Sequence, residues 1–293
     1  MAHDDPTPPA AEHGGVAQPF RSEVLAIDVD GHVATVWLDR PEKRNALGPA
    51  FWADLARAMD SVTSDPDVRV VVIAARGPHF SVGLDLTAMG GLSGQADPGG
   101  GSSVAARAAA TRAEVLRLQA SVTSVATCPK PVIAAVHGYC IGGGVDLIAA
   151  CYIRLATADA IFSVRETKVA IVADLGSLQR LPGIIGRGHV AELAYTGKDI
   201  DAARAAEIGL VNHVVADEAA LADAASALAS EIAANSPLAV QGTKAVLSAA
   251  DHRRVAEGLE YVAVWNAAFL ASNDLTEAMG AFLEKRPATF SGT

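Results

Sequence analysis

The sequence predicts a mixed α/β fold that ends in a helical region. Residues 23–38 alternate apolar and polar side chains around Asp30-Gly31, which is typical of a β-hairpin closed by a tight turn. Residues 69–75 form a continuous run rich in β-branched side chains, which is typical of a strand buried on both faces. From Asp217 onward every periodic segment is helical. A hairpin followed by alternating strands and helices indicates an α/β architecture.

Local start and stop signals place the other elements. Gly48-Pro49 begins a predicted helix that reaches about residue 63. Residues 90–103 are rich in Gly and Ser, so we expect a mobile loop there, followed by a long helix over 104–126. The remaining expected elements are a strand at 131–136, a short helix at 145–151, a helix at 187–195 ended by Gly197, a short helix between Asp201 and Gly209, a strand at 210–215, and later helices that begin at Ser236-Pro237 and at Asp274 with Glu277.

Three regions are expected along the chain. Residues 1–21 form a disordered tail, residues 22–213 form the core, and residues 214–293 form a C-terminal helical region. The tail is acidic and Pro-rich and has neither a basic nor an apolar segment, so it is not a secretory signal. In the C-terminal region Tyr261, Trp265 and Phe269 follow one another at helical spacing. This stripe predicts a helix face buried in the core or in a subunit interface.

Composition excludes several classes of protein. With 23 basic and 33 acidic residues the chain has a formal charge of −10, and no dense basic patch points to nucleic acid as a partner. The longest uncharged, apolar-leaning run, residues 131–145, is too short to span a bilayer, so no membrane is expected as a partner. The three cysteines lack a CxxC spacing, which indicates free thiols in a reducing compartment, and we expect a cytoplasmic location. The histidines show no ligand spacing, and we expect no metal.

Three consecutive glycines mark the most informative stretch. Residues 142–144 stand between the apolar strand and the short helix, where the unpaired N–H groups of a first helical turn offer donors to a developing anion. Carboxylates follow at Asp146, Glu166 and Asp174, each among apolar neighbours. Acids with little access to water have raised pKa values and act in proton transfer. The pattern predicts an oxyanion site surrounded by carboxylates.

Two segments carry a family resemblance. Residues 80–86 (Phe-Ser-Val-Gly-Leu-Asp-Leu) and 142–146 (Gly-Gly-Gly-Val-Asp) resemble the signature segments of the crotonase (enoyl-CoA hydratase/isomerase) superfamily. Residues 164–182 resemble its Δ3,5-Δ2,4-dienoyl-CoA isomerase branch, and the similarity runs from about residue 23 to the C-terminus. The resemblance implies a crotonase-like β/α spiral core with a C-terminal helical oligomerisation region.

The resemblance also implies roles for individual residues. The backbone N–H groups of Leu84 and Gly143 would form the oxyanion hole for a thioester enolate. One such donor lowers the activation barrier by about 3–4 kcal/mol. Hydratases of the superfamily carry Glu at both of the first two acidic positions and no acid at the third. Isomerases of the dienoyl branch resemble the Asp146, Glu166 and Asp174 set found here. Glu166 and Asp174 would move the proton between C2 and C6 of a 3,5-dienoyl-CoA, and Asp146 would orient or tune them.

Binding of the substrate is implied by the same resemblance. Lys43 and Arg44 are candidates for the phosphates of coenzyme A, and Phe282 and Lys285 resemble a C-terminal element that touches CoA in relatives. Coenzyme A is then part of the substrate, and no further cofactor is implied. Relatives form trimers, commonly paired into hexamers, so a homo-trimer or hexamer is expected. The implied setting is fatty acid metabolism by β-oxidation.

Alternatives stay open at the level of sequence. The chain could hydrate a 2-enoyl-CoA, or it could bind CoA thioesters without catalysis. Asp146 could be a structural salt-bridge partner, Asp85 a helix cap, and Asp174 the N-cap of a helix that starts at Leu175. Without the resemblance, Lys43, Arg44 and Lys285 would be solvated surface charges. Which of the two proton-transfer acids serves C2 is not decided by the sequence.

Overall fold

The computed structural model describes residues 20–88 and 103–293. The tail expected at 1–21 therefore lies almost wholly outside the described residues, and so does the Gly/Ser-rich loop at 90–103. The strands are β1 (Leu25–Asp30), β2 (Val33–Leu38), β3 (Val70–Ala75), β4 (Val132–Val136), β5 (Tyr139–Ile141), β6 (Ile153–Thr157), β7 (Ile161–Ser163), β8 (Ile200–Asp201) and β9 (His213–Val215).

Helices follow most of the strands. They are α1 (Pro49–Ser64), α2 (Val104–Thr127), α3 (Gly143–Ala149), α4 (Ser177–Arg180), α5 (Arg187–Thr196), α6 (Ala202–Glu207), α7 (Glu218–Ala233), α8 (Pro237–Phe269) and α9 (Asn273–Glu284). Short 3-10 turns are η1 (Pro41–Lys43), η2 (Glu166–Val169) and η3 (Leu181–Gly183). No helix in the described part of the chain is long and apolar enough to cross a membrane.

Two sheets form the centre of the molecule. Within the described residues the larger sheet has the order β1-β2-β3-β4-β6-β9, in which β1 and β2 pair antiparallel and the other neighbours pair parallel. The predicted hairpin and the mixed α/β class are thus confirmed. A smaller sheet, β5-β7-β8, was not predicted, because strands of two or three residues carry no readable period.

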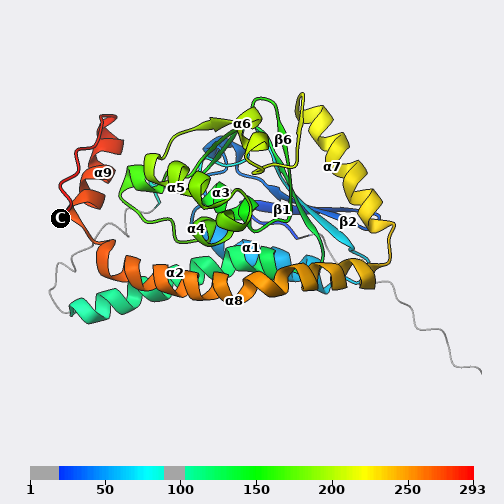
Figure 1. Ribbon diagram of the computed structural model, residues 1–293, viewed down its shortest axis with the longest axis horizontal. Helices are drawn as coiled ribbons and strands as arrows, with labels where there is room; N and C mark the ends of the chain where they lie inside the picture. Colours follow the sequence, from blue (N-terminus) through cyan, green and yellow to red (C-terminus); the bar gives the residue numbers. More distant parts are fainter. Residues whose placement is uncertain (1–19, 89–102) are drawn as a thin grey trace, which may run out of the picture.

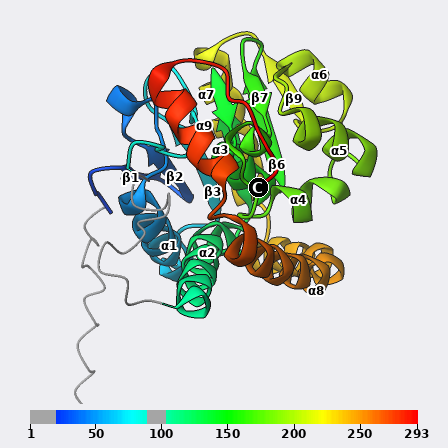
Figure 2. The same ribbon diagram turned by 90° about the vertical axis from the view of Figure 1, so that its left-hand side faces the viewer.

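Packing on both faces of the larger sheet explains the apolar run in β3. Val70, Val72 and Ala74 face a cluster that includes the buried side of α7, whereas Val71 and Ile73 face the main core. Successive strand residues point to opposite faces, so only a strand covered on both sides needs an unbroken apolar run. Figures 1 and 2 show α7 on one side of the sheet and α1 and α2 on the other.

The C-terminal helices frame one end of the molecule. Helices α2 and α8 lie side by side along the lower edge in Figure 1, and α9 stands across the end of both in Figures 1 and 2. The stripe Tyr261, Trp265 and Phe269 on α8 is exposed, by 69%, 42% and 59%. Its expected burial in the core of the chain is therefore wrong, because α8 turns the opposite face, with Leu259 and Val262, toward α2 and the core.

Several element boundaries differ from expectation. Helix α3 begins at Gly143 rather than residue 145, and β9 begins at His213 rather than residue 210. Helix α9 is capped by Ser272, whose side-chain oxygen accepts from the Leu275 N–H, whereas the Asp274 carboxylate accepts from the Ser291 N–H at 2.7 Å. Several polar side chains near the start of a helix can accept from its first N–H groups. The capping-box spacing pointed to Asp274, but Ser272 makes this contact.

Candidate active site

The two signature segments lie next to each other on a small backbone ladder. The Ser81 N–H donates to the Tyr139 carbonyl at 2.8 Å, and the Ile141 N–H donates to the Ser81 carbonyl at 3.0 Å. On the other side, the Leu47 N–H donates to the Gly83 carbonyl at 2.8 Å. These bonds bring the residue after Gly83 close to the start of α3.

Glycine is required at this junction by geometry. Gly83 has φ +84°, and a Cβ there would lie 2.8 Å from the Ile141 carbonyl oxygen. Gly142, with φ +51°, is the N-cap of α3, and a Cβ there would lie 3.3 Å from Oε1 of Glu166. The junction is therefore closed to side chains, and the Glu166 carboxyl group faces the backbone just before Gly143.

Two backbone donors at the junction have no partner among the described residues. Among the hydrogen bonds of residues 20–88 and 103–293, none uses the N–H of Leu84 or of Gly143. Neighbouring N–H groups are occupied, since Gly142 donates to the Ser163 carbonyl and Asp85 donates to the Leu47 carbonyl. The two donors expected to form an oxyanion hole are thus the ones that remain free to bind an oxygen atom.

An ion pair anchors the segment that follows Leu84. Arg40 Nη1 donates to Oδ2 of Asp85 at 2.8 Å, and the other Asp85 oxygen accepts from Thr87 Oγ1 and from the Ala88 N–H. These bonds hold the pKa of Asp85 below its usual value, although burial acts in the opposite direction. Residues 86–88 form a turn, so Asp85 closes a turn there and does not cap a helix within the described residues.

Asp146 is fully buried beneath the junction. Its Oδ1 accepts from the Ser177 N–H at 2.5 Å, at the start of α4. Burial raises the pKa of Asp146, while this hydrogen bond and the nearby charge of Arg180 lower it. No cation lies within ion-pair distance of Asp146 in the described part of the chain, so the salt-bridge interpretation is wrong. The N-cap residue of α4 is Gly176, and Asp146 accepts from the first N–H of this helix, a contact that the sequence suggested for Asp174.

Glu166 lies at the start of η2 with one oxygen lacking a partner. Its Oε2 is buried and makes no hydrogen bond with the described residues. Burial raises the pKa of Glu166, and the negative charge of Asp146 raises it further. A carboxyl group in such surroundings favours its protonated form and takes up a proton readily.

Asp174 is held by the C-terminal region. Oδ2 of Asp174 accepts from Nδ2 of Asn266 on α8 at 2.7 Å, so Asp174 does not cap a helix; α4 begins at Ser177 after Gly176. Burial raises the pKa of Asp174 to about 7, the Asn266 hydrogen bond lowers it, and the charge of Asp146 raises it. The three predicted acids are thus close enough to shift one another's pKa. Among the described residues, no group of three or more His, Cys, Asp or Glu side chains is arranged so that it could hold a metal ion.

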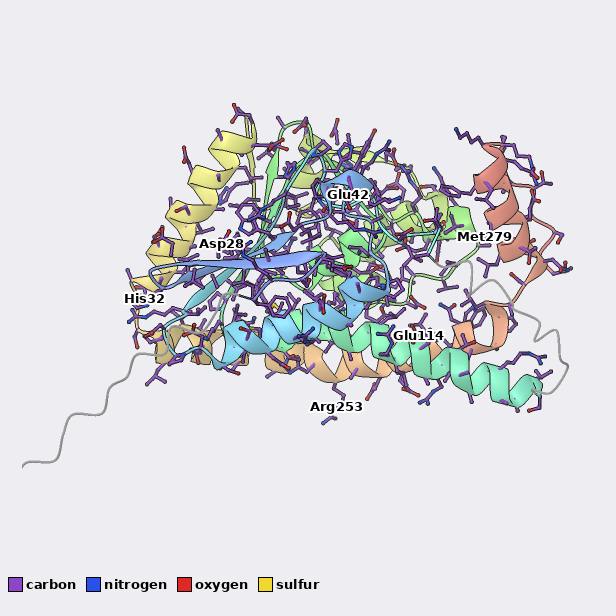
Figure 3. All side chains as sticks on the ribbon, turned by 180° about the vertical axis from the view of Figure 1, so that it is seen from behind. Asp28, His32, Glu42, Glu114, Arg253 and Met279 are labelled. Carbon is purple, nitrogen blue, oxygen red and sulfur yellow. The ribbon has the colours of Figure 1, made fainter. Side chains whose placement is uncertain are left out.

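An apolar pocket opens beside Asp174. Its walls come from residues 84–86, from α2, from residues after η2, from the C-cap of α8 and from α9. The apolar side chains that form it include Leu84, Val115, Ile171, Leu270, Leu275 and Met279. Figure 3 shows Glu114 on α2 and Met279 on α9 at the same end of the molecule. Asp174 lines this pocket and Glu166 does not; the Glu166 carboxyl group lies beside Gly142 instead.

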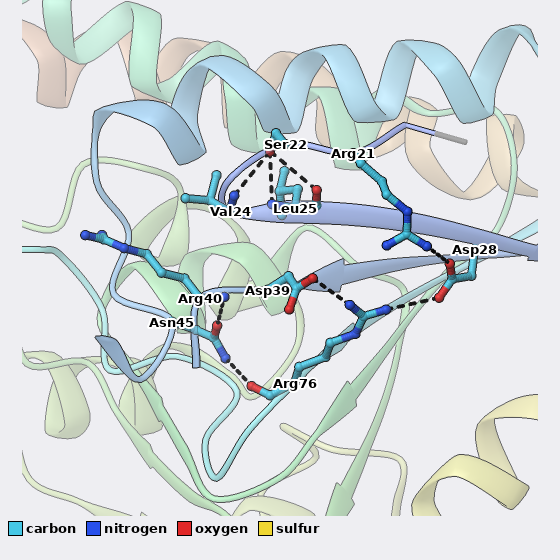
Figure 4. Close-up of polar contacts among 9 residues, drawn as sticks. All are labelled: Arg21, Ser22, Val24, Leu25, Asp28, Asp39, Arg40, Asn45 and Arg76. Atoms are coloured by element: carbon cyan, nitrogen blue, oxygen red, sulfur yellow. Dashed lines mark hydrogen bonds and ion pairs between the residues drawn. The ribbon is translucent and has the colours of Figure 1, made fainter. Parts of the chain in front are cut away.

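The four candidate CoA contacts are at the surface. Lys43 ends η1, and Arg44 follows it with φ +51°; both side chains are exposed. Asn45 fixes this turn, because its Nδ2 donates to the Arg76 carbonyl and its Oδ1 accepts from the Arg40 N–H (Figure 4). Its Nδ2 also donates to the His79 carbonyl. In the described part of the chain no hydrogen bond or ion pair joins this turn to α9, where Phe282 is half-exposed and Lys285 is exposed.

Sequence reasoning missed the residues that hold Asp174. Gln119 on α2 donates through Nε2 to the Asp174 backbone carbonyl at 2.8 Å, and Asn266 binds its carboxylate. A signal was present, since Leu259, Val262, Ala263 and Asn266 recur at helical spacing and form the buried face of α8. A lone amide on an apolar face points to a buried polar partner.

Comparisons with known proteins agree with this geometry. The family model described as enoyl-CoA hydratase/isomerase matches residues 28–293. Over 269 residues the chain is 41% identical to the peroxisomal Δ(3,5)-Δ(2,4)-dienoyl-CoA isomerase of Arabidopsis thaliana, covering 92% of this chain and 96% of that one. It is 44% identical over 264 residues to the mitochondrial Δ(3,5)-Δ(2,4)-dienoyl-CoA isomerase of Rattus norvegicus, covering 89% and 80%.

A solved structure matches the whole fold. The enoyl-CoA hydratase/isomerase from Xanthobacter autotrophicus Py2 superposes with a TM-score of 0.78 at 31% identity, over 89% of this chain and 93% of the other. One expectation is contradicted: the isomerases named above are peroxisomal and mitochondrial proteins, so the inference of a cytoplasmic location is wrong. The expected crotonase-like fold is confirmed, and the chain belongs to the enoyl-CoA hydratase/isomerase family.

Proposed function

We propose that the protein converts 3,5-dienoyl-CoA to 2,4-dienoyl-CoA. The observation that carries the proposal is Asp174, a third buried carboxylate that lines the apolar pocket. A shift of two double bonds needs proton transfer at two distant carbons of the acyl chain. One acid in the apolar pocket and a second acid, Glu166, beside Gly142 fit that requirement. The names of the relatives from Arabidopsis thaliana and Rattus norvegicus support the same reaction.

The proposed mechanism begins at the thioester carbonyl. Its oxygen accepts from the free N–H groups of Leu84 and Gly143, which stabilise the charge that develops when C2 loses a proton. Glu166 takes the C2 proton, because its Oε1 faces Gly142 next to this carbonyl site. The electron pair from the C2–H bond spreads over an extended dienolate.

Asp174 completes the transfer. It donates its proton to C6, and the electrons of the dienolate form the new C6–H bond and the conjugated 2,4-diene. One proton leaves C2 and one arrives at C6, so the reaction needs neither a metal nor a redox cofactor. Glu166 then returns its proton to Asp174 before the next turnover. Asp146 tunes this pair, since its charge raises the pKa of both acids.

The acyl group that this pocket accepts is apolar. Its walls are Leu, Ile, Val and Met side chains, and its one lining acid outside the catalytic set, Glu114, is paired with Arg117 at 2.7 Å. A fatty acyl chain, as in β-oxidation, and a ring-bearing acyl group both fit this chemistry. A series of dienoyl thioesters of different chain length should show the preference in kcat/KM, and a preference for anionic acyl chains would contradict the assignment.

Coenzyme A would bind across the surface near Lys43 and Arg44. These two cations would contact its phosphates, and Phe282 and Lys285 on α9 would contact CoA in the same or a neighbouring subunit. We also propose a homo-trimer or hexamer, because the stripe Tyr261, Trp265 and Phe269 leaves an apolar face of α8 in solvent. Light scattering should give a multiple of the 30.0 kDa chain mass, and a folded monomer would contradict it.

One assay separates isomerisation from hydration. Incubation with a 3,5-dienoyl-CoA should generate the ultraviolet absorbance of a conjugated 2,4-dienoyl thioester. Incubation with a 2-enoyl-CoA should leave its absorbance nearly unchanged, because a hydratase would remove the conjugated double bond. Rapid loss of enoyl absorbance without formation of a dienoyl product would replace the proposal by hydration. Binding of both thioesters without turnover would indicate a CoA-binding module.

A further inference from the structure

Two amide side chains, from helices that are far apart in the sequence, hold the segment that carries Asp174. Asn266 on α8 donates from Nδ2 to the Val172 carbonyl at 3.0 Å and to Oδ2 of Asp174 at 2.7 Å. Gln119 on α2 donates from Nε2 to the Asp174 carbonyl at 2.8 Å and to the Leu259 carbonyl at 3.0 Å. Both side chains are buried, with 2% and 4% exposure. One amide therefore contacts the reactive carboxylate, and the other contacts only backbone.

The two proposed proton-transfer acids differ in the hydrogen-bond partners of their carboxyl groups. Asp174 has a fixed amide donor on one carboxylate oxygen, whereas Oε2 of Glu166 is buried without a partner among the described residues. An N–H donor stabilises the ionised carboxylate and also fixes the direction in which the second oxygen points. The asymmetry makes Asp174 the stronger acid of the pair, which suits its proposed role as the proton donor to C6.

We propose that Asn266 is a positioning residue for the reaction: it aims the Asp174 carboxylate into the acyl pocket and stabilises the ionised form that Asp174 reaches when it gives its proton to C6. The inference rests on the proposed function, because it assigns Asn266 a role through Asp174. It explains why a polar side chain stands beside the buried apolar residues Leu259, Val262 and Ala263 of α8. It also makes the C-terminal region part of the catalytic machinery, since α8 supplies the donor.

The other charges around Asp174 do not substitute for this donor. Asp146 on α3 and Glu166 on η2 are acids and oppose its ionisation. Glu114 on α2 lines the same pocket but is paired with Arg117, and the charge of Arg180 on α4 acts on Asp146. The α9 residues at the pocket, Leu275 and Met279, are apolar. Loss of Asn266 would therefore raise the pKa of Asp174 above its value of about 7.

The test compares pH profiles of kcat for the full-length protein and its variants. Activity requires one proton shared between Glu166 and Asp174, so the acidic limb reports the more acidic member of the pair. Replacement Asn266→Leu removes the donor and keeps the branched shape of the side chain. It should move this limb upward by about one pH unit, to the pKa of Glu166 of about 8, because loss of a hydrogen bond to a charged group raises the pKa of Asp174 by about one unit or more. Asn266→Asp also removes the donor and adds a like charge, and it should move the limb in the same direction.

Gln119→Leu is the matched control. It removes a buried amide that holds the same segment through backbone only, so it should lower thermal stability and leave the acidic limb in place. An unmoved limb in Asn266→Leu, or an equal shift in Gln119→Leu, would overturn the inference. Carbon NMR titration of the Asp174 carboxyl group gives a second readout that needs no turnover. If Asn266→Leu does not fold, Asn266→Asp, which keeps the side-chain volume, takes its place in the test.

The outcomes also separate this inference from the proposed function. If the wild-type protein does not convert a 3,5-dienoyl thioester, the proposed function fails, and the NMR titration still tests whether Asn266 controls Asp174. If conversion is normal and the Asp174 titration is the same in wild type and Asn266→Leu, only the role of Asn266 fails.

Discussion

The junction at Gly83 and Gly142 and the segment around Asp174 belong to one site but are held by different contacts. At the junction, backbone ladders between residues 47, 81–83 and 139–141 fix the donors, and positive φ angles exclude side chains. At Asp174, side chains from α2 and α8 provide the support, from 55 and 92 residues away in sequence. The comparison teaches that the proposed oxyanion hole depends on local backbone geometry, while Asp174, the proposed proton donor, depends on side chains of α2 and α8.

The largest expected effect comes from Asp174→Asn. Turnover should fall by about 10²–10⁴-fold, because the variant lacks a group that exchanges a proton. Binding of a CoA thioester, measured by calorimetry, should stay within a few-fold of wild type. Asp251→Asn, which alters an exposed acid on α8 paired with Arg254, is the control and should turn over normally. Unchanged turnover in Asp174→Asn would remove Asp174 from the mechanism.

Gly83→Ala should have the next largest effect. The added Cβ would clash with the Ile141 carbonyl and displace the Leu84 N–H, so kcat should fall by about 10²–10³-fold, as for loss of one oxyanion donor. Gly31→Ala is the matched control: Gly31 also has a positive φ, of +55°, but nothing lies within 4 Å of its added Cβ. It should cost stability without a comparable loss of kcat. Equal losses in both variants would mean that backbone strain alone explains the result.

Replacement Asp174→Asn, which should lower turnover, should raise the stability of the folded protein at neutral and basic pH. The pKa of Asp174 is about 7 in the folded protein against 3.8 as its ordinary value, so folding favours its protonated form. Wild type therefore loses stability as pH rises from about 4 through 7, and Asp174→Asn loses less, because only the raised pKa values of Asp146 and Glu166 remain. At pH 8 the variant should be more stable by on the order of 1–4 kcal/mol, and the gap should close near pH 4. Denaturant unfolding at both pH values measures it, and a gap that widens toward low pH would contradict the raised pKa.

The smallest expected effect concerns CoA binding at the surface. Arg44→Ala should raise KM by about two- to five-fold and leave kcat unchanged, because one exposed charge contributes about 0.2–1 kcal/mol and is screened by salt. The effect should shrink at high ionic strength. Arg253→Ala changes an exposed cation on α8 outside the proposed CoA contacts and should leave KM unaltered (Figure 3). A lower kcat in Arg44→Ala would show that this turn affects the chemistry as well.

The sequence by itself determined the parts of the site that depend on neighbouring residues. The hairpin, the positions of Gly83 and the glycine triplet, and the three acids were all readable, because turn chemistry and steric exclusion act within a few residues. Gly197 in the left-handed region and Asp201 at an N-cap likewise matched their local signals. The family resemblance supplied the roles, and the comparisons support the family.

Tertiary structure decided what each acid contacts. The sequence suggested that Asp174 caps a helix, but Asp146 accepts from the first N–H of α4 and Asp174 accepts from Asn266. Helix α9 closes the acyl pocket with Leu275 and Met279, which no local pattern indicated. These contacts join residues far apart in the chain, and their partners are selected by how α2, α8 and α9 pack against the core. Local propensity carries no information on that packing, so the surroundings that set the pKa of Asp174 became visible only in the folded protein.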